Sequence, residues 1–320
     1  MSIPSERVRL AVALLELEGV GPMTAAEVLA GIAGLPQRAD ELFKELSALI
    51  ERRVLTRTFQ VSVAILQSAL DRADQILERC HALGINIADS SDAAFWKGVW
   101  QIPNPPLLLF YRGRPSEAVA RAGVAVIGTR HPTEYGAQRA YEFANECVKR
   151  GLMVVSGLAQ GCDAAAHRGA LDGGGCTIAL LAHGLHTVHP QQNCELAEQM
   201  VNAGGLLVSE YPPGQELRPF QLVRRDRLQA AFSRGLIVIE TDIKGGTMHT
   251  VRFGIRQRRF VACLAHSLEL QSAPMSRGNQ MLIDTGIARP LATQEDLTAF
   301  LKQLETVNVD PPGIQETFEF

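Results

Sequence analysis

The chain has 320 residues, of which 46% are hydrophobic and 20% are charged, and its net charge at pH 7 is −3. This composition excludes a disordered chain, which would be more polar and more highly charged, and no run reaches the roughly 18 apolar residues of a membrane-spanning helix. The first residues lack the basic and apolar segments of a signal peptide, so we expect a cytoplasmic protein without a membrane partner.

Six cysteines are scattered along the chain, and none of them stands in a Cys-x-x-Cys pair. Zinc ribbons and dithiol redox motifs require such pairs. We therefore expect buried free thiols, no metal and no other cofactor.

The first 83 residues are expected to form a small all-helical domain. Apolar residues recur at helical spacing in Val8–Leu17 and in Ala25–Ile32, and residues 39–82 have the pattern of further amphipathic helices. The intervening sequence Gly-Val-Gly-Pro at 19–22 is similar to the turn of a helix-hairpin-helix, in which backbone N–H groups bind a DNA phosphate. Because this turn has no basic residue, a simple tight helical hairpin is the alternative that we favour.

From residue 84 onward the sequence alternates short apolar runs, glycine-containing loops and amphipathic segments. Runs that are apolar on both faces and separated by helices indicate a mostly parallel sheet that is covered on both sides. We therefore expect an extended Rossmann-like, doubly wound α/β domain over residues 84–305, followed by an extended tail over residues 306–320. The predicted strands are 84–88, 107–111, 124–127, 152–155, 177–181, 206–208, 236–239 and 260–263.

Ligands of such sheets bind beyond the carboxyl ends of the strands, near the point where the strand order reverses. The loop after the run at 124–127 begins with Gly128, and Arg130 follows two residues later. An arginine at this place can meet an anion, although a surface arginine without a ligand is the alternative. The loop lacks the Gly-x-Gly-x-x-Gly pattern of dinucleotide sites, which argues against hydride transfer.

The loop after the run at 152–155 is a candidate phosphate cradle. Its residues Ser156, Gly157 and Gly161 precede an expected helix, whose free N–H groups and positive dipole end favour an anion. Asp163 and His167 stand four positions apart and could form an acid/base pair. Because no nucleophile is indicated nearby, we favour helix capping by Asp163 and predict no catalytic residue.

His183, His186 and His189 have a spacing that suggests a metal site. Gly184 and Pro190 indicate a turn rather than a helix, so the three rings need not converge, and no carboxylate or cysteine completes the ligand set. We therefore favour structural histidines.

Basic residues concentrate between Arg218 and Arg259, where ten basic and only three acidic residues lie. Arg224, Arg225 and Arg227 fall at an expected helix start. Asp226 alone cannot neutralise all three, and guanidinium groups bind phosphates bidentately or stack on bases. We favour contacts with single-stranded DNA over a solvated helix end.

The loop after the run at 236–239 is a second candidate phosphate cradle before a helix. Lys244 adds a flexible cation at its start. The cradle residues are Gly245, Gly246 and Thr247. The helix that follows is expected to carry a basic stripe or a solvated face, made by Arg252, Arg256 and Arg259.

Several motifs in this order resemble those of the DprA/Smf family of DNA-processing proteins, a Rossmann-like family related to the lonely-guy enzymes. The resemblance runs from about Leu83 to Leu297, and the helical segment before it is similar to a small domain that the family often carries. The motifs are NPPLLLFYRG (104–113), VAVIGTR (124–130), VVSGLAQGCDAAAHRGAL (154–171), LVSEYPPG (207–214), RRDR (224–227) and GNQMLIDTG (278–286).

This resemblance implies a protein that binds single-stranded DNA without base specificity in a pocket over the sheet. It also implies loading of the RecA recombinase during uptake of transforming DNA, and a homodimer formed through the same domain. Carried over by position, the DNA-binding residues are Arg130, Arg224, Arg225, Arg227 and Lys244.

The sequence departs from the family pattern at three places. Thr129 replaces a usual serine, Asp226 replaces the asparagine of the RRNR motif, and residues 246–250 replace a serine-glycine-serine run. An acidic residue between the arginines is expected to weaken DNA binding, so the chain is interpreted as a divergent paralogue.

Two rival functions stay open. A lonely-guy-type phosphoribohydrolase would need a glutamate three positions after Thr247, where Thr250 stands. A DprA-like antitoxin or sensor in mobile-element or phage defence would instead bind a toxin, another effector protein or a nucleotide.

Overall fold

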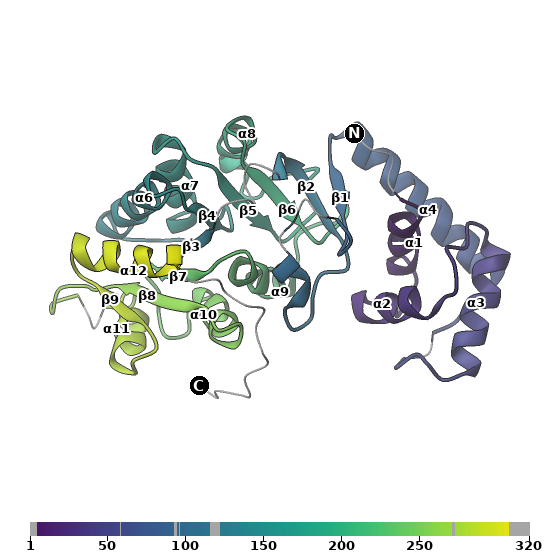
Figure 1. The fold of residues 1–320 in the computed structure, drawn as a ribbon. Coiled ribbons are helices and arrows are strands. Elements are labelled where there is room, and N and C mark those ends of the chain that lie inside the picture. The colour runs from purple at the N-terminus through teal and green to yellow at the C-terminus, as the bar shows by residue number, and fades with distance from the viewer. Residues whose placement is uncertain are drawn as a thin grey trace.

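The protein consists of a small helical lobe and a larger α/β lobe, which lie side by side (Figure 1). The structure is a computed structural model, and it describes residues 5–57, 59–92, 95, 97–115, 122–270 and 273–306. The predicted tail therefore lies outside the described residues, apart from Thr306. Within these ranges, no helix combines the length and the apolar composition needed to cross a membrane.

Four helices form the N-terminal lobe, as the apolar spacing predicts. Ser5 and Ser62 cap the first and the last of them, because each hydroxyl accepts a hydrogen bond from a backbone N–H three residues later. Leu14, Leu46 and Leu66 are completely buried between the helices. The helices are α1 (Glu6–Leu15), α2 (Pro22–Gly31), α3 (Ala39–Glu51) and α4 (Val63–Ala82).

The Gly-Val-Gly-Pro turn joins α1 to α2 as a tight helical hairpin. Gly19 has a φ of +78°, in the left-handed region that favours glycine, and Pro22 occupies the first position of α2, where its missing N–H costs nothing. The hairpin is therefore confirmed, and DNA binding by this turn stays a prediction.

The α/β lobe contains a sheet with the order β1-β2-β6-β5-β4-β3-β7-β8-β9. All strand pairs from β6 to β9 are parallel, and the β1-β2 and β2-β6 pairs are antiparallel. The predicted mostly parallel sheet is confirmed, with β9 as an addition. The strands are β1 (Asn86–Ala88), β2 (Leu109–Gly113), β3 (Gly123–Ile127), β4 (Met153–Ser156), β5 (Thr177–Leu181), β6 (Leu206–Ser209), β7 (Gly235–Val238), β8 (Phe260–Leu264) and β9 (Arg289–Leu291).

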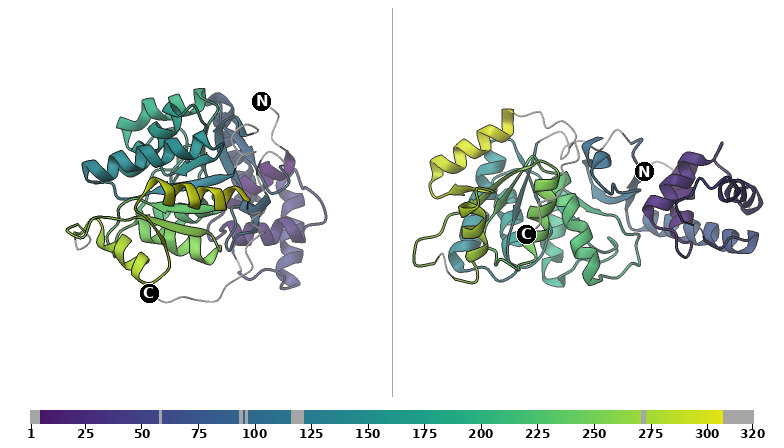
Figure 2. Two further views of the ribbon diagram at one scale, coloured as in Figure 1. Left: turned by 60° about the vertical axis from the view of Figure 1, so that its left-hand side comes forward. Right: turned by 90° about the horizontal axis from the view of Figure 1, so that it is seen from below.

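Helices cover both faces of this sheet (Figures 1 and 2). Val124 and Val126 of β3 join an apolar cluster with α6, α7 and α12, whereas Ala125 and Ile127 join a cluster with α10 and α11 on the other face. The alternation explains why the run is apolar throughout. The helices are α6 (Glu134–Lys149), α7 (Cys162–Asp172), α8 (Cys194–Asn202), α9 (Pro219–Ala231), α10 (Thr247–Arg256), α11 (Arg277–Asp284) and α12 (Gln294–Thr306), with the 3-10 helices η1 (Lys97–Gln101) and η2 (Gln191–Asn193).

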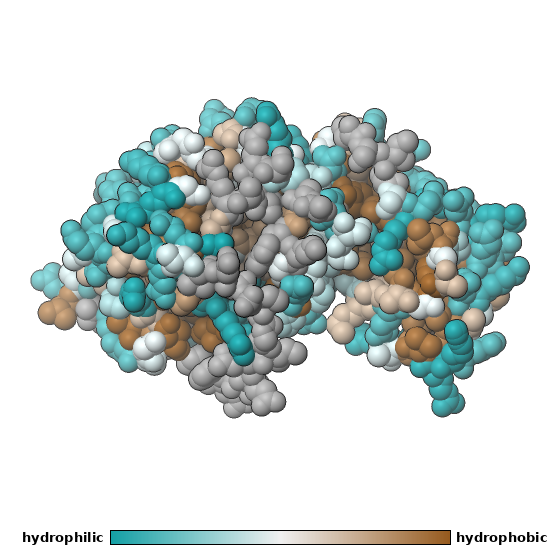
Figure 3. All heavy atoms as spheres, in the orientation of Figure 1, coloured by the Kyte–Doolittle hydropathy of each residue, from teal (hydrophilic) through white to brown (hydrophobic). Residues whose placement is uncertain are grey.

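The two lobes share one buried apolar cluster. Leu10 and Leu70 of the helical lobe belong to the same cluster as Phe110 of β2 and Leu207 of β6. Hydrophilic side chains cover most of the visible surface of both lobes (Figure 3). Smaller hydrophobic areas are interspersed among the hydrophilic side chains, as is usual for globular proteins. The predicted boundary at 83/84 lies in the connection between α4 and β1.

The six cysteines are free thiols, as predicted. Five of them are buried and Cys194 is partly exposed. Burial raises the pKa of Cys80 and of Cys147 to about 12, because it disfavours the thiolate.

Candidate functional site

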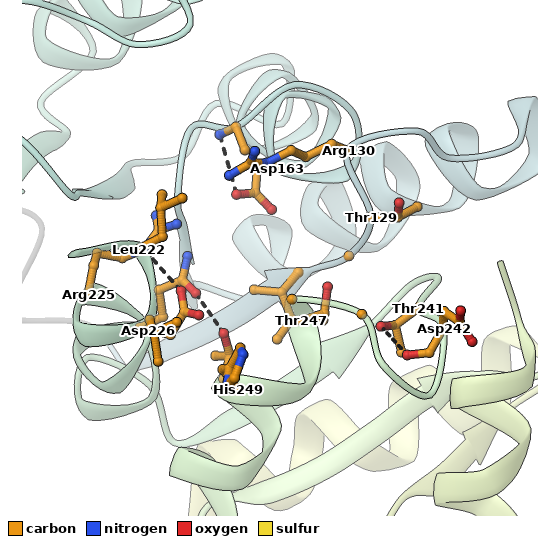
Figure 4. A pocket seen from close by; sticks show the side chains of 18 of the residues that line it. Thr129, Arg130, Asp163, Leu222, Arg225, Asp226, Thr241, Asp242, Thr247 and His249 are labelled. Carbon is orange, nitrogen blue, oxygen red and sulfur yellow. Dashed lines mark hydrogen bonds and ion pairs between the residues drawn. The ribbon is translucent and has the colours of Figure 1, made fainter. Parts of the chain in front are cut away.

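A large cavity lies where the strand order reverses, between β3 and β7. Its volume is about 480 Å³. The loops after these two strands, the start of α7 and the helices α9 and α10 provide its walls, and their side chains face a common space (Figure 4). This is the position at which open parallel sheets bind ligands.

Arg130 lies at the edge of this cavity and is exposed to solvent. The loop that carries it is fixed from the end of β7: Thr133 donates hydrogen bonds from its backbone N–H and its hydroxyl to Glu240, at 2.8 and 2.5 Å. Thr129 N–H also donates to the Glu240 carbonyl oxygen at 2.8 Å. Glu240, which is 1% exposed, is a positioning residue that the sequence analysis missed, although its place directly after a strand could have indicated it.

The start of α10 forms a second wall. Gly245, Gly246 and Thr247, the residues of the second predicted cradle, line the cavity, and no side chain caps this helix start. The positive end of the helix dipole favours an anion here, whereas the N–H groups of Met248 and His249 donate to the carbonyl oxygens of Gly245 and Gly246. Lys244 is exposed but is not among the described residues that line the cavity, so its contact with an anion stays a prediction.

The loop after β4 does not form the predicted phosphate cradle, because an internal carboxylate occupies it. Asp163 accepts hydrogen bonds from the N–H groups of Gly157 and Ala159, at 3.1 and 3.4 Å. Ser156 is completely buried and donates its hydroxyl proton to the Val126 carbonyl oxygen. Burial raises the pKa of Asp163. The prediction that this loop presents Ser156 and Gly157 to an external phosphate is therefore wrong.

Gly161 is required by chain packing, and its contact with an anion stays a prediction. Its φ is +85°, and a Cβ atom here would lie 2.6 Å from the carbonyl oxygens of Thr129 and Arg130. The loops after β3 and β4 approach each other at this point, where Cys162 N–H donates to the Thr129 carbonyl oxygen. Gly128 has a similar role, because its Cβ would lie 2.5 Å from Sγ of Cys162, and it also lines the cavity.

Arg225 is the basic residue that α9 presents to the cavity. It is 7% exposed, its Nη1 donates to the Leu180 carbonyl oxygen at 2.6 Å, and its Nε donates to Asp226 at 3.1 Å. A Cβ atom on Gly157 would lie 1.9 Å from Arg225 Nη1. Gly157 is therefore required to make room for this guanidinium.

A buried carboxyl group, Asp226, reduces the positive charge of the cavity. Burial raises the pKa of Asp226 to about 6, although the neighbouring Arg225 acts in the opposite direction. Asp163 lines the same cavity and raises the pKa of Asp226 further. Above about pH 6, the Asp226 carboxylate therefore opposes the two arginines, Arg130 and Arg225.

The other two arginines of α9 are oriented differently. Glu210 binds Arg227 through both guanidinium Nη atoms, at 2.5 and 2.6 Å, and both side chains are nearly inaccessible. The prediction that Arg227 is free to bind an anion is wrong. Glu210 also lies 3.8 Å from Arg224 Nε, and neither arginine lines the cavity in the described chain.

The three arginines do not lie at the start of the helix, as was predicted. Helix α9 begins five residues before Arg224, at Pro219.

The predicted basic stripe on α10 is shorter than expected. The helix ends at Arg256, and Arg259 lies beyond it in a buried position. Burial lowers the pKa of Arg259 to about 10. Only Arg252 and Arg256 of the three lie on the helix.

The histidines singled out by spacing do not converge. Among the described residues, no group of three or more His, Cys, Asp or Glu side chains could hold a metal. His183 contacts the edge of the His189 ring, whereas His186 accepts a hydrogen bond from Gly214 N–H. His167 is completely buried against Thr177, with its Nδ1 at 2.7 Å from the hydroxyl. The acid/base pair of Asp163 and His167 is thus not formed.

Comparisons with known proteins agree with this architecture. The family model of DNA recombination-mediator protein A matches residues 86–302. Protein Smf of Synechocystis is 35% identical over 71% of this chain, a segment that spans only 56% of that protein. The DNA processing protein DprA of Bacillus subtilis is 28% identical over 79% of this chain and 84% of its own length.

Two solved structures have the same fold. DprA of Streptococcus pneumoniae superposes with a TM-score of 0.72 at 24% identity, over 93% of this chain and 98% of that one. DprA of Helicobacter pylori, whose structure is described as giving insights into its single-stranded DNA binding mode, superposes with a TM-score of 0.59 at 27% identity, over 69% of this chain and 95% of that one. With the family model covering more than half of its length, the chain belongs to the DNA recombination-mediator protein A (DprA/Smf) family.

Proposed function

We propose that this protein is a DNA-processing protein that binds single-stranded DNA without base specificity, with the phosphates in the cavity between β3 and β7. The observation that carries the proposal is the convergence of Arg130, Arg225 and the uncapped start of α10 on one open space. Phosphate neutralisation supplies affinity that does not depend on base identity. The described binding mode of the Helicobacter pylori relative supports the same ligand.

An exposed aromatic side chain beside the cavity supports a strand rather than an isolated phosphate. Phe220 is 59% exposed on the first turn of α9, between Pro219 and Leu222, which both line the cavity. Single-strand binding proteins combine a positively charged groove with aromatic rings on which bases stack. We assign Phe220 this stacking role.

We further propose that the protein is not an enzyme. Thr250, where the rival phosphoribohydrolase would have its glutamate, is 2% exposed and donates its hydroxyl proton to Gln229. The three carboxyl groups that line the cavity, Asp163, Asp226 and Asp242, are engaged with backbone N–H groups, with Arg225 and with Arg277, respectively. Release of free base from nucleoside monophosphates, followed by chromatography, would contradict this proposal.

Loading of a RecA-type recombinase and formation of a homodimer are proposals that follow from family membership. A strand held by its phosphates keeps other bases accessible to a second protein. Light scattering of the purified chain tests the dimer, and pull-down of a RecA-type recombinase on a coated strand tests the partner.

The proposal is tested by fluorescence anisotropy with a labelled short oligothymidylate at several salt concentrations. We expect wild-type affinity to fall steeply with salt, and Arg130→Ala or Arg225→Ala to reduce it by roughly a hundredfold at low salt, because contacts with a charged, partly buried pair are worth about 2–5 kcal/mol. Arg256→Ala is the matched control, since Arg256 is exposed on α10 outside the cavity. A folded wild-type protein that does not bind at low salt would contradict the proposal.

A further inference from the structure

A smaller cavity adjoins the proposed phosphate site and is not used by it. Its volume is about 150 Å³, compared with about 480 Å³ for the proposed phosphate site, which favours a single planar ring over a whole nucleotide. The two cavities have four wall residues in common. These residues are Arg130, Ala159, Leu222 and Arg225.

Apart from the arginines at the shared wall, this small cavity is mostly apolar. Leu181, Ala182 and Leu217 contribute aliphatic surface, and the rings of His183 and His189 stand nearly perpendicular to each other, at 86°. No carboxylate is among the described residues that line it. A flat, uncharged group is therefore favoured over a phosphate.

His183 supplies one hydrogen-bond acceptor that lacks a partner. Its Nδ1 lies 2.9 Å from the Gly184 carbonyl oxygen, and because a carbonyl oxygen can only accept, Nδ1 carries the proton. Burial lowers the pKa of His183, which keeps the ring neutral. Nε2 is then an acceptor, and within the described chain this buried atom has no hydrogen-bond partner although the side chain is only 3% exposed.

The occupant must therefore be planar, uncharged and able to donate a hydrogen bond. We propose that the small cavity holds one unstacked nucleobase of the bound strand, whose phosphate lies at Arg130 and Arg225, with His183 Nε2 accepting a hydrogen bond from the base. Every natural base has an N–H on its pairing edge, so this subsite is compatible with binding that ignores sequence. The inference rests on the proposed function, because only a bound strand delivers the base.

The first test changes the ligand and leaves the protein intact. Anisotropy is measured with three strands of equal length and equal phosphate number: oligothymidylate, the same strand with N3-methylthymine throughout, and a strand of abasic sites. N3-methylation removes the donor that thymine offers. We expect oligothymidylate to bind roughly tenfold more tightly than either modified strand, since one engaged base contributes on this scale.

The second test changes the acceptor. His183→Leu is expected to weaken oligothymidylate binding roughly tenfold while leaving the affinity for the abasic strand unchanged. His183→Gln is expected to restore part of the preference, because its side-chain oxygen can accept a hydrogen bond. His81→Leu, on the exposed end of α4, is the matched control, and circular dichroism verifies folding.

The outcomes separate the two proposals. If wild type binds none of the strands, the proposed function fails and the inference fails with it. If wild type binds oligothymidylate and N3-methylthymine strands equally, the base subsite is refuted while DNA binding stands. A folded His183→Leu variant that keeps the full preference for oligothymidylate likewise refutes the role of His183.

Discussion

Two glycine-containing loops follow strands of the same sheet, and a carboxylate binds the glycine N–H group in only one of them. In the loop after β4, the N–H groups of Gly157 and Ala159 bind Asp163. In the loop after β7, Gly245 and Gly246 border the cavity, and α10 begins there without a side-chain cap. The difference lies in the second residue of the helix, which is Asp163 in α7 and Met248 in α10.

A glycine loop before a helix is available to an external anion only where a carboxylate of the protein does not already bind its N–H groups. A carboxylate in the first turn satisfies the same N–H groups and the same helix dipole that a phosphate would. Glycine then has a steric purpose instead, as the contact between Gly157 and Arg225 demonstrates.

The largest change in stability and affinity is expected from a methyl group added at Gly157, in contrast to one added at Gly246. At Gly157, a Cβ atom would lie 1.9 Å from Arg225 Nη1, whereas at Gly246 a Cβ atom would meet nothing within 4 Å. We expect Gly157→Ala to lower the free energy of unfolding by about 1–3 kcal/mol and to reduce oligothymidylate affinity by displacing Arg225. Urea denaturation and anisotropy measure the two effects.

Gly246→Ala is the matched control for this substitution and is expected to change the free energy of unfolding by less than about 0.5 kcal/mol. Equal stability losses for the two variants would remove the distinction between the loops.

An intermediate effect is expected from Asp226→Asn. The pKa of Asp226 is raised from 3.8 to about 6, so the folded wild type binds more protons than the unfolded chain between these values. Its stability therefore falls as pH rises from about 4 to about 6, and its DNA affinity falls as the carboxylate becomes charged. The asparagine variant is expected to bind several-fold more tightly at pH 8, with a flatter pH profile.

The wild-type pH profile has to be compared with that of the variant, because Asp163, whose pKa is also raised by burial, lines the same cavity. The difference between the two profiles reports on Asp226, since every other residue is common to both proteins. If the profiles coincide, Asp226 does not control the charge of the cavity.

The smallest effect on affinity is expected from Lys244→Ala, which tests the edge of the loop after β7. Lys244 is exposed and lies outside the cavity wall, so its loss is expected to lower affinity only a few-fold and to reduce the slope of log affinity against log salt by at most about 1. A loss as large as that of Arg130→Ala would mean that the strand lies farther towards α10 than proposed.

The sheet could be predicted well from sequence because its buried strands are apolar on both faces. Thr177–Leu181 was predicted with the bounds of β5. The strand β9 was missed because it has only three residues, two of them exposed, with a proline at the centre. The start of α9 was predicted near the arginines. The helix begins earlier, at Pro219, which occupies its first position, where proline is favoured.

The candidate site was predicted in part. Arg130 and residues 245–247 line the cavity because they follow the ends of β3 and β7, and Arg225 reaches it from α9. The engagement of Arg227 could not be foreseen, because its partner Glu210 lies 17 positions earlier in the sequence. The local sequence shows how many charged side chains a segment has, but it does not reveal which of them are paired with residues elsewhere in the fold.

The contact of Glu210 with two arginines of α9 has a further consequence for how this family can vary. Glu210 approaches Arg224 and Arg227, which are three positions apart and share a helix face, and Arg225 stands on a different face. The number of cations that α9 offers to a ligand is thus determined by a residue outside the helix. A single exchange at position 210 would change the charge that an unaltered arginine motif presents, so that affinity for an anion can evolve without any substitution at the proposed DNA-binding surface.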